Sequence, residues 1–88
     1  MNCLKKYSLT KDRPALIIEL TDMEVVDEFE NIRYTTYGVR VTDEGGNILY
    51  AAPDVDTNRG YVEAFIKLCA DNDAHLVHIP DLLEDYLL

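Results

Sequence analysis

The stretch RYTTYGVRVTDEGGNILYAAP, residues 33–53, decides the fold. β-Branched and aromatic residues dominate both of its halves, which is typical of strands. Between the halves, residues 42–47 (TDEGGN) are rich in the Asp, Gly and Asn that favour a tight turn. The stretch therefore predicts a β-hairpin whose second strand ends at Pro53. A strand glycine such as Gly38 predicts a bulge or a close-packed side chain from the opposite layer.

The sequence upstream of the hairpin predicts further strands. Residues 3–10 alternate weakly and carry lysines, as edge strands do. Residues 11–14 form a turn that ends in Pro14, and residues 15–20 are a short apolar run of strand type.

Residues 21–31 fit two patterns. The letters TDME (21–24) have the form of a helix capping box, and Met23, Val26 and Phe29 recur at helical spacing. The same residues also fit an irregular strand. We favour a strand-and-loop excursion that joins the two halves of a meander.

The sequence downstream predicts two helices. Asp56 or Thr57 caps the first, which runs over residues 57–72. Its apolar stripe consists of Val62, Phe65, Ile66 and Cys69. Residues 74–79 connect it to a second helix, residues 80–87, which begins at Pro80 and is so short that its leucines need to be buried. Together these elements predict a single α+β domain over residues 1–88, in which two C-terminal helices pack on one face of a small antiparallel sheet of three or four strands.

The charge distribution disfavours nucleic-acid and membrane partners. The chain has a formal net charge of −9; the first thirteen residues carry +3 and the remainder −12. A domain that is mostly acidic repels phosphate groups. No apolar run approaches the roughly 18 residues that cross a bilayer, and no apolar segment follows Lys5 and Lys6, so we expect a cytoplasmic protein.

The two cysteines, Cys3 and Cys69, do not indicate a disulfide framework. Cys69 falls within the apolar stripe of the first helix, where a buried thiol is an inert core residue.

The second half resembles a family of small bacterial domains of unknown function. The matching segments are residues 37–41 (YGVRV), 54–57 (DVDT), Val62 with Cys69, and 78–87 (HIPDLLEDYL). The resemblance spans about residues 16–87. It implies the α+β fold and carries no functional residue with it.

Asp54, Asp56 and Asn58 form one candidate metal site. Their alternate spacing matches the first, third and fifth positions of a calcium loop. The sixth position is Arg59 where that loop needs glycine, and the twelfth is Phe65 where it needs glutamate. A helix N-terminus rich in capping residues explains the same letters.

His75 and His78 form a second candidate metal site, with Cys69, Asp73 and Asp81 nearby in the sequence. Two histidines in a connector converge on a metal only if the segment turns helically. The simpler interpretation places His78 at the entry to the last helix.

No catalytic signature is present. Ser8 is the only serine and lacks a glycine elbow, and Gly45-Gly46 belongs to the hairpin turn rather than to a phosphate loop. We therefore expect no enzyme and no cofactor.

The six tyrosines are the strongest remaining indication of function, because tyrosine is enriched at interfaces. We expect a non-enzymatic interaction or regulatory module that binds a protein partner or forms a homodimer. Its expected contact surfaces are the acidic residues 19–30 and the C-terminal helix, in particular Leu83, Tyr86 and Leu87. The alternatives are a metal- or small-ligand-binding domain, and an acidic mimic of nucleic acid that binds a basic protein.

Overall fold

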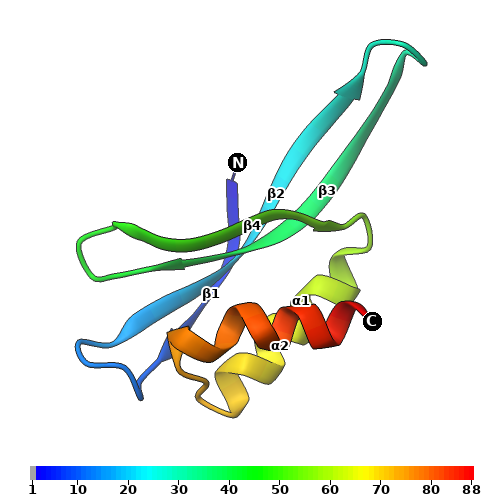
Figure 1. The fold of residues 1–88 in the computed structure, drawn as a ribbon. Coiled ribbons are helices and arrows are strands. Elements are labelled where there is room, and N and C mark those ends of the chain that lie inside the picture. Colours follow the sequence, from blue (N-terminus) through cyan, green and yellow to red (C-terminus); the bar gives the residue numbers. More distant parts are fainter. Residues whose placement is uncertain (1) are drawn as a thin grey trace.

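The computed structural model describes residues 2–88 and contains four strands followed by two helices (Figure 1). In chain order the elements are β1 (Asn2–Leu9), β2 (Leu16–Asp27), β3 (Ile32–Thr42), β4 (Ile48–Asp56), α1 (Arg59–Asp71), the 3₁₀ turn η1 (Leu76–His78) and α2 (Ile79–Leu87). The predicted α+β class is confirmed.

The four strands form one antiparallel meander in the order β1-β2-β3-β4. Both helices lie on the same face of this sheet (Figure 1). The hydrophobic core fills the space between the two layers. It consists of Leu9, Leu16, Ile18, Leu20, Val39, Val41, Val62, Phe65, Ile66, Cys69, Ile79 and Leu83.

The hairpin of β3 and β4 confirms the prediction from residues 33–53, and Asp43 explains its turn. The Asp43 Oδ1 atom accepts hydrogen bonds from the backbone N–H groups of Gly45 and Asn47, both at 2.9 Å. Gly46 adopts a φ of 82°, a conformation that glycine reaches without steric cost.

The predicted end of the second strand at Pro53 is wrong, because β4 continues to Asp56. β4 is an edge strand, where a missing N–H group is tolerated, and its register against β3 shifts between Tyr37 and Val39. At this shift β4 passes so close to Gly38 that a Cβ there would lie 2.6 Å from Pro53 Cα. The predicted irregularity at Gly38 is therefore confirmed as a register shift, and the close neighbour is the backbone of β4 rather than a side chain of the opposite layer.

The segment 21–31 is strand and loop rather than helix, as favoured from the sequence. β2 runs without interruption to Asp27, and a turn over residues 28–31 leads into β3. The helical spacing of Met23, Val26 and Phe29 has no structural counterpart, because each residue of β2 from Asp22 to Asp27 pairs with β3.

The first helix is capped by Asn58, the residue that follows the two predicted caps, Asp56 and Thr57. The Asn58 side chain accepts from the Tyr61 N–H group at 3.2 Å. The predicted apolar stripe of α1 is confirmed, since all four of its residues are buried.

The second helix begins at Ile79, with Pro80 in its first turn. The expectation that its leucines are buried is met only in part. Leu83 belongs to the core, whereas Leu82 and Leu87 are exposed. Neither α1 nor α2, the two α-helices found in residues 2–88, combines the length and apolar character required to cross a bilayer.

Candidate interaction site

The hairpin of β2 and β3 extends beyond the rest of the sheet as a two-stranded arm, which we define as residues 24–35. The pairing of β1 with β2 reaches only Asp22, and the pairing of β4 with β3 reaches only Tyr37. β2 and β3 continue to pair with each other as far as Asp27 and Ile32. The arm therefore projects from the body of the molecule with no further strand beside it in the described chain (Figure 1).

Large apolar side chains are exposed along the arm. Val25 pairs with Tyr34, and Asp27 with Ile32, which places Tyr34 and Ile32 on the same face of the ribbon. Ile32 is 46% exposed and Tyr34 40%. Val26 is also exposed, on the opposite face beside Arg33.

The tip of the arm presents Phe29 to solvent. Asp27 Oδ1 accepts hydrogen bonds from the N–H groups of Phe29, at 3.0 Å, and Glu30, at 3.4 Å. Asn31 closes the turn with a φ of 54°, a left-handed conformation that asparagine tolerates. This hydrogen-bonded turn leaves the Phe29 side chain fully exposed.

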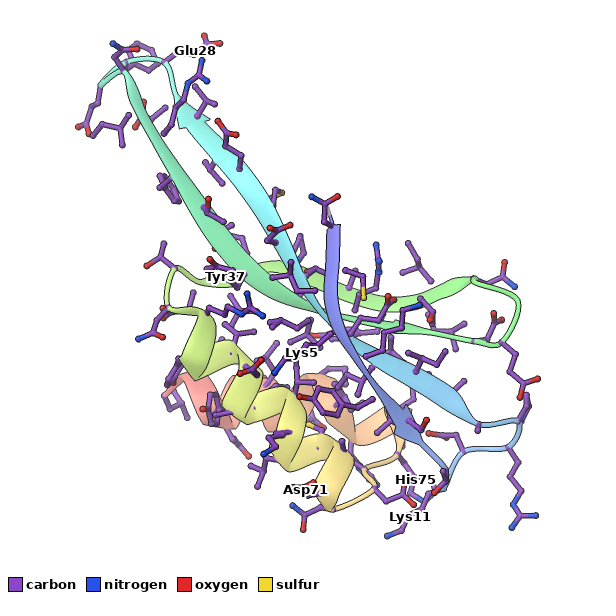
Figure 2. The ribbon with its side chains drawn as sticks, turned by 180° about the vertical axis from the view of Figure 1, so that it is seen from behind. Lys5, Lys11, Glu28, Tyr37, Asp71 and His75 are labelled. Atoms are coloured by element: carbon purple, nitrogen blue, oxygen red, sulfur yellow. The ribbon has the colours of Figure 1, made fainter. Side chains whose placement is uncertain are left out.

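The arm is acidic. It contains Glu24, Asp27, Glu28 and Glu30 against a single base, Arg33. Arg33 lies 3.6 Å from Glu24, and both side chains are largely exposed, so this ion pair contributes little to stability. Glu28 lies at the far end of the arm, where it is surrounded by solvent (Figure 2).

Glu19, the first residue of the predicted acidic surface, does not belong to that surface. It is buried and accepts two hydrogen bonds from the Arg40 guanidinium, at 3.0 and 3.3 Å. Burial opposes ionisation of Glu19, but the hydrogen bonds and charge of Arg40 outweigh it, so the pKa of Glu19 is lowered. Glu19 is therefore a structural residue of the sheet.

A second apolar surface lies between α1 and α2. It is a groove of about 400 Å³. Its lining residues are Phe65, Leu68, Cys69, Asn72, Ala74, Leu82, Asp85 and Tyr86.

The three predicted contact residues of the last helix lie in three different environments. Tyr86 lines the groove and Leu87 is exposed. Leu83 is only 5% exposed and packs in the core. Leu83 can therefore influence a contact surface only by holding α2 in place.

The three residues of the candidate calcium loop do not converge. Asp54 Oδ1 accepts from the Thr36 hydroxyl at 2.6 Å, and Asp56 Oδ1 accepts from the Asn58 N–H group at 2.7 Å. Asn58 caps α1. The Asp56 and Asn58 oxygens serve the start of α1, which is the capping role weighed from the sequence, whereas Asp54 joins β4 to β3.

Of the two histidines, His75 has a structural contact, whereas His78 stands at the entry to α2 with its side chain exposed rather than packed. His75 Nδ1 lies 3.5 Å from Asp12 Oδ1, while Asp12 Oδ2 accepts from the Leu76 N–H group at 2.9 Å. The rings of His75 and His78 are 6.3 Å apart, edge to face. Within residues 2–88 no three His, Cys, Asp or Glu side chains are grouped to hold a metal ion.

Asp73, the acidic neighbour of His75, joins the end of α1 to the segment that follows β1. Its carboxylate accepts from the Thr10 N–H and hydroxyl groups, both at 2.6 Å. These bonds, with one from Lys11, lower the pKa of Asp73. Lys11 and His75 accordingly lie at the same end of the molecule (Figure 2).

The sequence did not indicate Phe29, Ile32 and Tyr34 as a group. The signal that was present is the mixture of acidic and apolar residues over 24–30, which fits a ribbon with solvent on both faces. The strand pairing reveals the group, because neither the pairing of β1 with β2 nor that of β4 with β3 extends into residues 24–35.

The described chain is thus a small α+β domain, made of an antiparallel meander covered by two helices on one face and extended by an acidic arm. It belongs to a family of unknown function, DUF6514, whose model matches residues 2–88. No curated protein and no solved structure matches the chain. The resemblance to a small domain family of unknown function is therefore confirmed.

Proposed function

We propose that this protein is a non-enzymatic interaction or regulatory module whose arm, residues 24–35, binds a partner protein. The observation that carries the proposal is the fully exposed Phe29 at the tip of a ribbon that also exposes Ile32 and Tyr34. Exposed aromatic and aliphatic side chains gathered in one place are typical of contact surfaces.

The position of the core supports this proposal. All twelve residues of the core cluster lie outside residues 24–35. The apolar residues of the arm therefore contribute little to folding, although exposing them to water is unfavourable. A partner that covers them would remove that cost.

The non-enzymatic part of the proposal rests on the available nucleophiles. Burial raises the pKa of the Cys69 thiol to about 11, which keeps it protonated at neutral pH. Ser8 lies in β1 and, among the described residues, makes no side-chain hydrogen bond with a base. The acidic arm likewise favours a protein partner over nucleic acid or an anionic membrane.

The test is affinity capture from an extract of the source cells with the tagged full chain as bait. The informative variant is Phe29→Ser, and the matched control is Val77→Ser, which removes another apolar side chain that is 73% exposed but far from the arm in sequence. We expect the wild type and Val77→Ser to retain a common partner that Phe29→Ser loses. Equal capture by all three proteins would reject the arm as the binding surface.

A further inference from the structure

The outer edge of β3 within the arm, residues 32–35, has no neighbouring strand among residues 2–88. β4 pairs with β3 at Tyr37 and beyond, and the chain then turns into α1 after Asp56. All four residues of this edge are exposed. Each residue of a strand has its N–H and C=O groups directed to one side or the other, so the edge presents unpaired donors and acceptors to solvent.

The composition of this edge favours pairing with another strand. Ile32, Tyr34 and Thr35 are β-branched or aromatic, and Arg33 is the only charged residue among them. The free edges of the body are different. β1 carries Lys5 and Lys6 and a register shift, and β4 carries Pro53 and two register shifts. Lysines, prolines and bulges are the devices that prevent a strand from joining an edge, and of these the 32–35 edge has none.

We propose that residues 32–35 bind an extended, basic segment of a partner protein, which adds to the arm as a fifth strand beside β3. This inference rests on the proposed function of the arm and specifies how the partner is recognised. The added strand would form main-chain hydrogen bonds with the edge, and its alternate side chains would cover Ile32 and Tyr34.

The charge of the arm selects a basic strand. An added strand would lie about 4.8 Å from β3, whose one charged residue over 32–35 is Arg33, already 3.6 Å from Glu24 of β2. With Glu24, Asp27, Glu28 and Glu30 against Arg33, the arm as a whole has a net charge of −3, and this net charge favours a basic segment. It also disfavours a second copy of this chain, because two arms of like net charge would repel each other.

The test uses the full chain labelled with nitrogen-15 and two probe peptides of eight residues. One peptide alternates lysine and valine, and the matched control alternates glutamate and valine. We expect the lysine peptide to shift the amide resonances of residues 32–35 and to slow exchange of their outward amides at least tenfold. We expect the glutamate peptide to bind at least tenfold more weakly.

A proline variant tests the backbone contribution. The residue among 32–35 whose amide exchanges fastest in the free protein is replaced with proline, which removes one outward N–H group. Loss of lysine-peptide binding with an unchanged spectrum for the body supports strand addition. Unchanged binding overturns it.

Three further results would contradict the inference. The first is that the lysine peptide shifts only the resonances of Phe29 or of the groove between α1 and α2. The second is equal binding of the two peptides, and the third is slower amide exchange of residues 32–35 when the protein concentration alone is raised. The first would leave the proposed function intact if Phe29→Ser still abolishes capture, so the two proposals fail separately. The last would identify a second copy as the occupant.

Discussion

Tyr61 of α1 and Tyr86 of α2 each donate a hydroxyl hydrogen bond to the backbone carbonyl of the other, at 2.8 and 2.9 Å. Their rings also pack with centroids 4.7 Å apart. This reciprocal pair joins the two helices at the end of the molecule where α1 begins and α2 ends. α2 is short and buries only Ile79 and Leu83, so we infer that the tyrosine pair is a principal attachment of its C-terminal half.

We predict that Tyr61→Phe lowers the free energy of unfolding by about 1 kcal/mol, the usual contribution of one hydrogen bond. The substitution keeps the ring contact and removes only the donor. Urea unfolding measures the change, and Tyr34→Phe, on the exposed arm, is the matched control. If the two variants were equally stable, the hydrogen bond would not be holding α2.

Replacement of Gly38 with Ala should be among the most destabilising single changes in the sheet. The added Cβ would meet the Ala52 carbonyl oxygen and lie 2.6 Å from Pro53 Cα, and backbone cannot yield as a flexible side chain does. We expect a loss of about 3 kcal/mol or more, measured by thermal or urea unfolding. Gly45→Ala is the control, because its nearest neighbours are side-chain atoms at 3.4 Å. A Gly38→Ala protein as stable as the control would contradict the close approach of β4.

The ion pair of Glu19 and Arg40 should make stability depend on pH in the acidic range. The pKa of Glu19 is lowered on folding from its ordinary value of 4.5. Its contribution is therefore fully present above about pH 4.5 and is lost as the pH falls through the lower, folded value. We expect the acid side of the stability curve to be less steep in Glu19→Gln than in wild type, and a parallel curve would show that Glu19 is not responsible.

Removing only one partner of this pair should cost more than removing both. Arg40→Met leaves a buried carboxylate unpaired, which costs about 3–5 kcal/mol in comparable sites. The double variant Glu19→Met/Arg40→Met removes both charges and should recover most of that loss. Denaturant unfolding of the three proteins gives the comparison, and a double variant no more stable than Arg40→Met would contradict it.

The two thiols should differ in reactivity. Cys69 is almost completely buried and its pKa is raised to about 11, whereas Cys3 is half-buried. A thiol reagent at pH 8 should label Cys3 first and Cys69 only at the rate of unfolding. The Cys3→Ser variant is the control and should show no fast phase. Fast labelling of that variant would place Cys69 outside the core.

The hairpin of β3 and β4 and the stripe of α1 were predictable because their signals are local. In the turn, Asp43 accepts hydrogen bonds from Gly45 and Asn47. In α1, the buried apolar residues recur at the spacing of a helix. The helix cap was harder to place. Asp56, Thr57 and Asn58 are all good caps, and Asp56 instead accepts from the Asn58 N–H group.

The arm could not be predicted from its own residues. Exposure of Ile32 and Tyr34 depends on where β1 and β4 stop, which is a property of other segments. The burial of Glu19 likewise depends on a residue that is distant in the sequence. The sequence groups Glu19 with the acids that follow it, such as Glu24 and Glu28, which are exposed, but its position opposite Arg40 on β3 makes it a buried partner.

Removal of the arm tests the central claim most directly. Residues 24–35 are replaced with Asn-Gly, which closes a two-residue turn between Met23 and Thr36, a pair already opposite each other in the sheet. The shortened protein should melt cooperatively within a few degrees of wild type, because the core lies elsewhere, and should capture no partner. A shortened protein that folds and still retains the partner of the full chain would show that the arm is not the binding surface.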